Sequence, residues 1–466
     1  MDNWVVGCWV LIGVVVGWCW LKEKKKIEKK SGVPRGSLGW PFIGETLDFI
    51  ACGYTSRPVS FMDKRKSLYG KVFKTHILGT PIIISTDPDV NKVILHNHGN
   101  TFVPAYPKSI TELFGKNSIL QINGNLHKRV HALIGGFLRS PQHKARITKV
   151  IENSVKLSLS TWKDMHQIYV QDETKKAKER MLKMVEKMVE ERKIALKNTD
   201  EKGPIIDALD VLLRESCTGD SSDTQRLPSD FISGNIVEMM IPGEETMPTA
   251  MTLAVKFLSD CPVALEKLMH EHEHEHEHKH KHTSETESTC EGHVELKNGV
   301  DEENMELKKR KTDSCDDYGW TDYMSLQFTQ NVISETLRMA NIINGVWRKA
   351  LKDVEIKGYS IPQGWCVLAS FISVHMDEDN YENPHQFDPW RWEKIGAAVN
   401  NSCLTPFGGG QRLCPGLELS RLELSIFLHH LVTSYRWVAQ QDDIVHFPTV
   451  KMKRKLPIRV TPISST

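Results

Sequence analysis

The 466-residue sequence has almost no net charge, because 60 Lys and Arg residues stand against 59 Asp and Glu residues. A chain without a basic excess exerts no general attraction on a nucleic acid, so we expect no nucleic-acid partner. The ten cysteines follow no repeated spacing, which argues against a disulfide framework and against a zinc site. No flavin or dinucleotide fingerprint is present, so redox chemistry in this chain requires electrons from a separate protein.

A long apolar run lies near the start of the chain. Residues 4–21 carry no charged side chain and are just numerous enough to cross a bilayer as a helix. Tryptophans stand near both ends of this run, and residues 22–30 then bring six lysines against two glutamates. We therefore predict a transmembrane anchor over residues 1–21 with the rest of the chain cytosolic. A cleaved signal peptide is the alternative, but its basic residues precede the apolar run.

Turn-forming residues follow the anchor. Lysines, prolines and glycines favour a hinge over residues 22–44, before a single domain over residues 45–466. That domain is predicted to be mainly α-helical with a minor β region. Helices are expected over residues 126–138, 178–196, 231–259 (interrupted at Pro242) and 329–338. Strands are expected over residues 72–77 and 81–85, as a hairpin, and over residues 354–361 and 366–370.

Seven histidines alternate with glutamate and then lysine from His270 to His282. Histidine-rich tracts can bind metals, and alternation would place the imidazoles on one face of a strand. Residues 270–301 are almost devoid of apolar side chains, however, so burial cannot offset the entropy cost of ordering them. We predict a disordered surface insertion over residues 270–301, because residues 302–305 continue the helical pattern that stops at Met269.

The segment Pro406–Gly416 places Cys414 in a glycine-rich turn, directly before the apolar helical run of residues 417–431. Helix-terminal amides, a nearby arginine and a metal ion would each favour the thiolate. The spacing Phe-x-x-Gly-x-Arg-x-Cys-x-Gly resembles the haem-ligand loop of the cytochrome P-450 superfamily; the alternative is a structural cysteine in a turn. The other residues of the pattern are Phe407, Gly410, Arg412 and Gly416.

The resemblance implies a cytochrome P-450 fold around heme b, with Cys414 as the axial ligand of the iron. It further implies dioxygen as a reactant and NADPH-derived electrons delivered by NADPH-cytochrome reductase. In that family a Glu-x-x-Arg helix and a later arginine form a buried triad. The resemblance therefore assigns Glu335, Arg338 and Arg391 a structural role, which is to lock a core helix to the segment before the cysteine loop.

A second motif lies in the predicted helix over residues 231–259. Pro242 removes a helix hydrogen bond and Gly243 removes side-chain bulk, so the helix can widen where a ligand approaches. This resembles the oxygen-binding groove of the family. The resemblance assigns Thr246 the steering of water and protons to dioxygen, and Glu245 their supply. The alternative is a kinked core helix with a solvated acid.

Haem propionates need cations or hydrogen-bond donors. His127 and His131 stand where the family carries a Trp and an Arg four residues apart, so they are weaker candidates for propionate contacts. The alternative for these two residues is a basic surface helix that touches the redox partner. Arg348 and Arg412 are further propionate candidates. Candidate substrate-pocket residues are Phe102, Ile119, Leu120, Met239, Met240 and Ile342.

Several further stretches, among them residues 241–246, 347–350, 374–377 and 387–392, resemble the plant brassinosteroid-forming branch of the family. This resemblance implies hydroxylation of a steroid side chain at C-23, with the chain anchored in the lipid of the endoplasmic reticulum membrane. One alternative is another plant sterol or triterpenoid hydroxylase. Another is a haem-thiolate isomerase or dehydratase, which would need no proton relay to dioxygen.

The predicted helices over residues 126–138 and 178–196 lie too close together in the sequence for this family. Residues 172–176 resemble the start of one helix and residues 177–180 the middle of a later one. We therefore expect several helices of the substrate-site roof to be missing between Lys176 and Ala177. An open roof admits water and weakens substrate positioning. An inactive splice or gene-model variant is thus an alternative to an active enzyme.

Overall fold

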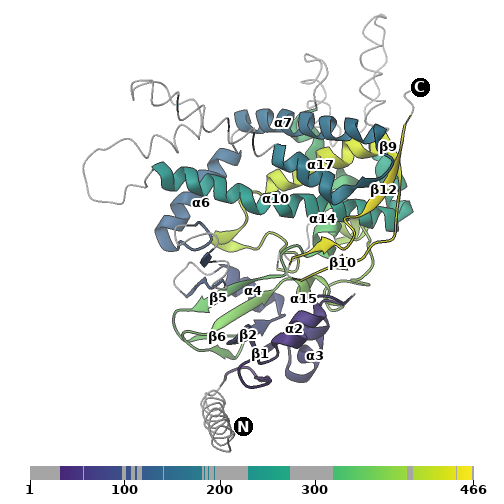
Figure 1. The fold of residues 1–466 in the computed structure, drawn as a ribbon. Coiled ribbons are helices and arrows are strands. Elements are labelled where there is room, and N and C mark those ends of the chain that lie inside the picture. Colours follow the sequence, from purple (N-terminus) through teal and green to yellow (C-terminus); the bar gives the residue numbers. More distant parts are fainter. Residues whose placement is uncertain are drawn as a thin grey trace, which may run out of the picture.

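A computed structural model describes residues 32–55, 57–96, 101–106, 111–112, 118–139, 141–180, 229–272, 318–395, 402–447 and 449–463, and three isolated positions between 181 and 228. Helices form one part of the molecule and a small sheet with short helices forms the other (Figure 1). The longer helices are α6 (Gly124–Arg139), α7 (Pro141–Ser160), α10 (Ser229–Asp260), α14 (Gln327–Ala340) and α17 (Leu417–Ser434). The fold is therefore mainly helical with a minor β region, as predicted.

The main sheet has the strand order β1-β2-β8-β5-β3. The strands are β1 (Val72–Ile77), β2 (Thr80–Ser85), β3 (Phe102–Pro104), β5 (Gly345–Ala350) and β8 (Cys366–Ser370). The predicted hairpin is confirmed, because β1 and β2 pair antiparallel from Val72 with Ser85 to Ile77 with Thr80. Its turn uses Leu78 and Gly79, both with positive φ, which matches the right-handed twist of the two strands.

The larger hydrophobic core lies among α7, α10, α14 and α17. Leu253 of α10, Ile333 of α14 and Leu422 of α17 are fully buried there. Helix α17 is buried along most of its middle, which explains why its sequence is apolar on nearly every face. This helix begins three residues after Cys414, so the core fixes the direction in which the chain leaves the cysteine loop.

The prediction of an interruption at Pro242 was wrong. Helix α10 runs unbroken over 32 residues, through both Pro242 and Pro248. A proline removes one backbone donor, but the neighbouring bonds and the packing can keep the helix intact. Hydroxyl groups add donors in the same stretch: Thr249 Oγ1 donates to the carbonyl of Glu245 at 2.8 Å and Thr252 Oγ1 to that of Pro248 at 2.6 Å.

Several predicted segments lie outside the described residues. These are the anchor over residues 1–21, most of the helix over residues 178–196, and residues 273–301 of the histidine-rich tract. Within the part of the chain that the structure does describe, no helix is both long enough and apolar enough to cross a bilayer. Residues 32–44 of the predicted hinge make turns against β1, where Gly36 bridges Lys74.

The first residues of the histidine-rich tract belong to the folded part. The helix over residues 262–272 continues through His272, which is fully buried. Glu271 accepts hydrogen bonds from the N–H groups of Phe328 and Thr329, at 2.8 and 2.9 Å, and from Thr329 Oγ1 at 2.6 Å. The residue before α14, Leu326, has no side chain that can cap the helix. Glu271 thus supplies the missing cap and a negative charge at the positive end of α14.

Glu271→Ala should lower the free energy of unfolding by about 2 kcal/mol, because the donors at the start of α14 lose a charged acceptor. Chemical denaturation followed by circular dichroism measures this change. Glu266→Ala, on the exposed face of the same helix, is the matched control and should change stability by less than about 0.5 kcal/mol. Equal losses in the two variants would contradict a capping role.

Candidate functional site

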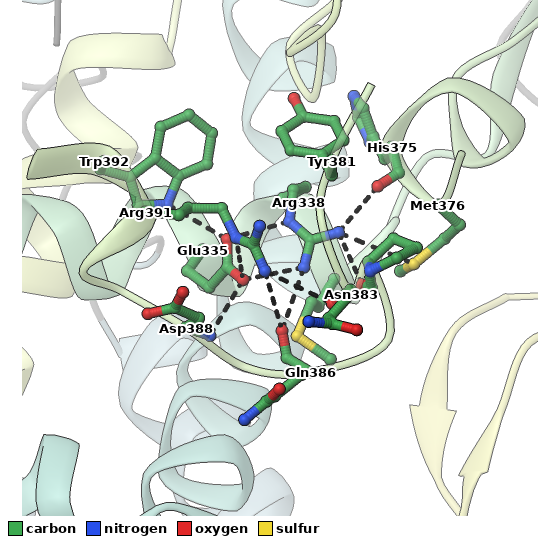
Figure 2. A network of polar contacts seen from close by, with 12 residues as sticks. Glu335, Arg338, His375, Met376, Tyr381, Asn383, Gln386, Asp388, Arg391 and Trp392 are labelled. Atoms are coloured by element: carbon green, nitrogen blue, oxygen red, sulfur yellow. Dashed lines mark hydrogen bonds and ion pairs between the residues drawn. The ribbon is translucent and has the colours of Figure 1, made fainter. Parts of the chain in front are cut away.

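Two arginines converge on one buried carboxylate ahead of the cysteine loop (Figure 2). Glu335 and Arg338 are fully buried on α14, and Arg391, at the start of α16 (Arg391–Ile395), is 5% exposed. Arg338 donates through Nε and Nη2 to the two carboxylate oxygens at 2.9 and 2.8 Å. Arg391 Nε donates to Glu335 Oε1 at 3.0 Å. The structure thus brings the three residues of the predicted triad together.

Neutral donors and acceptors complete this network. The Trp392 indole and the Asp388 backbone N–H each donate to Glu335 at 3.1 Å. Arg338 Nη1 donates to the carbonyls of His375 and Pro384 at 2.7 and 2.8 Å. A buried ion pair is stabilising only when such additional bonds satisfy its remaining charge. The network therefore ties α14 to residues 375–392, the segment that leads toward the cysteine loop.

Glycine geometry shapes the cysteine loop itself. Gly408 and Gly410 have φ of +75° and +63°, and a Cβ at Gly410 would lie 2.2 Å from the Leu95 carbonyl oxygen. Any other residue at this position is excluded by both conformation and space. The N–H of Cys414 donates to the carbonyl of Phe407 at 3.0 Å, which closes the loop. Gly416 then precedes the first residue of α17.

Cys414 is accessible from solvent at its surface, although protein atoms surround much of its sulfur. Burial raises the pKa of the thiol, and the backbone N–H of Gly416 acts in the opposite direction. A metal ion would therefore be needed to convert the thiol fully to the thiolate. Among the described residues no group of three or more His, Cys, Asp or Glu side chains is placed to hold a metal ion.

A cluster of cationic and imidazole side chains lies together: His127, Arg348 and Arg412. Burial, and then Arg412, lower the pKa of His127 to about 3. Burial, and then Arg348, lower the pKa of Arg412 to about 10. Arg348 is 4% exposed, and its Nη1 donates to the carbonyl of Trp347 at 3.0 Å. Within the described chain neither arginine has a carboxylate partner, so the cluster fits an anionic group such as the propionates of haem.

Arg412 and His131 also hold the protein around the loop. Arg412 donates to the carbonyls of Ile119 and Ile122 at 3.3 and 2.5 Å. His131 Nε2 lies 2.7 Å from the carbonyl oxygen of Leu413, the residue before Cys414. The ring of His131 stacks on that of His127 with centroids 5.5 Å apart. The structure therefore places His131 against the backbone of the loop.

The predicted oxygen-side residues lie on α10. Glu245 is exposed, and its carboxylate lies 3.7 Å from Lys175 Nζ, while Thr246 is half-buried. The described contacts of Glu245 run to Lys175 and Thr249, not to the residues around Cys414. Of the predicted pocket residues, Phe102 is buried in the sheet core and Ile342 packs against the larger core. The side chains of Met239 and Met240 lie outside the described residues.

Sequence reasoning missed several members of the buried network. Trp392 and Asp388 stand in the stretch that suggested Arg391, but an indole and a backbone amide carry no pattern that identifies a carboxylate partner. His375 was noticed only as part of residues 374–377. A histidine between apolar residues is a weak signal, and only the fold shows what it contacts.

Glu335→Gln should lower the free energy of unfolding by about 3–5 kcal/mol, because it leaves Arg338 and Arg391 buried without a counter-charge. Urea denaturation compares the variant with the unchanged chain. Glu393→Gln is the control, since Glu393 and its partner Lys267 are both about half exposed and their pair contributes less than about 1 kcal/mol. A loss of similar size in both variants would show that the triad adds no special stability.

Comparison with known proteins agrees with this geometry. A sequence model described as cytochrome P450 matches residues 34–172, 168–289 and 293–461. The chain is 57% identical to the 3-epi-6-deoxocathasterone 23-monooxygenase CYP90C1 of Arabidopsis thaliana, over all of this chain and 94% of that protein. It is 44% identical to the 3-epi-6-deoxocathasterone 23-monooxygenase CYP90D1 of the same plant, over 91% of this chain and 89% of that protein.

A solved structure shares the fold. Retinoic acid-bound cyanobacterial CYP120A1 superposes with a TM-score of 0.70, over 92% of this chain and 99% of that one, at 20% sequence identity. The match of the family model over most of the chain and the identity to two full-length relatives lead to one conclusion. This chain belongs to the cytochrome P450 family.

Proposed function

We propose that this chain is a haem-thiolate monooxygenase that hydroxylates a steroid side chain at C-23 in brassinosteroid biosynthesis. The observation that carries the proposal is the accessible Cys414 two residues after the half-buried Arg412, which faces the buried Arg348 and, like it, has no carboxylate partner in the described chain. Two relatives, 57% and 44% identical, are named 3-epi-6-deoxocathasterone 23-monooxygenases, which supports the substrate class and the oxidised carbon. Bound haem supplies the oxidising chemistry, from dioxygen and electrons.

The residues of the loop would hold heme b. Cys414 is assigned as the axial ligand, and its position before the positive end of α17 favours the thiolate once the metal is present. The backbone N–H of Gly416 donates toward the same sulfur. Arg348 and Arg412 would neutralise the propionates, and neutral His127 would donate a hydrogen bond to them.

Glu245 and Thr246 would pass protons to dioxygen. A proton relay from bulk water needs an exposed acid that takes up the proton and an inner group that passes it on. The exposed Glu245 and the half-buried Thr246 meet this requirement. The Glu245 carboxylate, 3.7 Å from Lys175 Nζ, is exposed to solvent. The exposed acid is thereby recharged from water while the alcohol stays inside the protein.

Electrons would come from NADPH through NADPH-cytochrome reductase, since this chain has no dinucleotide fingerprint. The anchor over residues 1–21 would hold the enzyme in the endoplasmic reticulum membrane with its catalytic domain in the cytosol. Large apolar side chains near the start of the described chain support a lipid-facing surface: Trp40 is 78% exposed, Phe42 67% and Leu47 70%.

We further propose that this chain lacks part of the roof of the substrate site that its relatives have. The 57% match takes 531 aligned positions whereas this chain has 466 residues, so at least 65 positions of the relative face no residue here. The family model also breaks its match at residues 168–172, close to the expected gap between Lys176 and Ala177. A shortened roof would weaken steroid positioning, so an inactive splice or gene-model variant is the alternative outcome.

The full-length chain, expressed with a supply of haem, should show the thiolate-type Soret band in its reduced, carbon-monoxide-bound state. Cys414→Ala should abolish this band because it removes the sulfur ligand. Cys403→Ala, whose thiol lies 3.8 Å from Asn380 Oδ1, is the control and should keep it. Absence of the band in the unchanged chain would retire the enzymatic proposal. Steroid turnover without NADPH and reductase would instead favour an isomerase or dehydratase.

Thr246→Ala should keep the Soret band but lower the steroid product formed per NADPH consumed by roughly tenfold or more, because protons reach dioxygen less efficiently. The ratio of product to NADPH, measured with added reductase, tests the relay. Thr249→Ala removes a hydroxyl from the same helix, where it bonds the Glu245 carbonyl, and should change this ratio little. Full coupling in Thr246→Ala would remove the relay assignment.

A further inference from the structure

His375 lies between the buried triad and the cysteine loop. It is the last residue of the short helix α15 (Ile372–His375) and is fully buried. Figure 2 shows its backbone carbonyl facing Arg338, which donates to it at 2.7 Å. Its ring makes two further contacts, to Asn341 Oδ1 through Nδ1 at 2.8 Å and to the backbone nitrogen of Thr405 through Nε2 at 3.0 Å.

The chemistry of these partners determines the state of the ring. The Thr405 N–H can only donate, so Nε2 must be the unprotonated acceptor. Asn341 uses its Nδ2 to donate to the carbonyls of Arg338 and Met339, which leaves Oδ1 to accept from the His375 Nδ1–H. Burial, and then the Arg338 charge, lower the pKa of His375 to about 3, in agreement with a neutral ring.

Two backbone hydrogen bonds lead from Thr405 along the loop to Cys414. The Thr405 carbonyl accepts from the Gly408 N–H at 3.0 Å, and the Phe407 carbonyl accepts from the Cys414 N–H at 3.0 Å. Thr405 is 8% exposed, so its N–H has no ready replacement partner in water. A shift of Thr405 therefore changes the turn that carries Phe407 and, with it, Cys414.

We propose that His375 is a positioning residue. By bonding both Thr405 and Asn341, at the end of α14, it fixes the position and orientation of the Cys414 loop. Asn341 closes the link, since it ends α14 in the left-handed conformation and orients the imidazole. The inference rests on the proposed function, because the positioned atom is the assigned haem ligand. His375 also connects the triad to the loop, because its carbonyl accepts from Arg338 and its ring accepts from the Thr405 N–H. The helix that holds Glu335 thereby sets the position of Thr405.

Two variants of the full-length chain test this role. His375→Leu keeps the volume and removes both ring bonds, whereas His375→Gln keeps one donor and one acceptor in a single amide. In His375→Leu the backbone amides of Thr405 and Cys414 should exchange with deuterium about tenfold faster. Haem should leave the variant about tenfold faster, and a smaller share of the bound haem should give the thiolate-type Soret band. His375→Gln should restore most of all three properties.

The control is Val332→Ala, which destabilises the core of α14 at a fully buried position outside this link. It should leave the share of thiolate-type haem and the exchange of Cys414 unchanged. Faster exchange at Thr405 alone, with Cys414 and haem release as in the unchanged chain, would overturn the inference. Equal effects of Val332→Ala and His375→Leu would do the same. If the unchanged chain takes up no haem, the proposed function fails, and the exchange of the Cys414 amide still decides the positioning role.

Discussion

The half of the molecule around the cysteine loop depends on a single carboxylate without access to water. Glu335 accepts from two guanidinium groups, an indole and a backbone amide, which come from α14 and from residues 388–392. A buried charge is tolerated only while such partners stay in place, and the loss of a charged partner costs about 3–5 kcal/mol. The segments that supply these donors are therefore held as one body, and the chain enters the cysteine loop from a fixed base.

The cluster of His127, Arg348 and Arg412 has the opposite electrostatic character. Two arginines and a neutral histidine lie together there, and within the described chain no carboxylate meets the arginines. Such an arrangement disfavours folding of the protein on its own, because burial and repulsion from Arg348 both oppose the charge on Arg412. A protein accepts this cost at binding sites, where a ligand of opposite charge offsets it. The triad stabilises the fold, whereas the cluster of His127, Arg348 and Arg412 is suited to an anionic group.

Local patterns predicted much of the fold. The hairpin β1–β2 and helices α6, α14 and α17 follow from alternating or helical spacing of apolar residues, and the structure agrees. The prolines of α10 misled the prediction, because packing over a 32-residue helix outweighs the loss of a backbone bond. The composition of residues 270–301, rich in acids and histidines, also led the prediction to miss the role of Glu271. Its carboxylate caps the start of α14, 57 residues further along the chain.

The sequence by itself determined the chemistry that this chain can offer. A cysteine in a glycine-rich loop, a Glu-x-x-Arg pair and a later arginine are recognisable because residue types and spacing carry the information. Only the tertiary structure decided which groups meet. His375 bonds Asn341 and Thr405, 34 and 30 residues away in opposite directions, and His127 meets Arg348 and Arg412 from other segments. These contacts depend on the packing of whole segments and on side-chain direction, and no local periodicity records either.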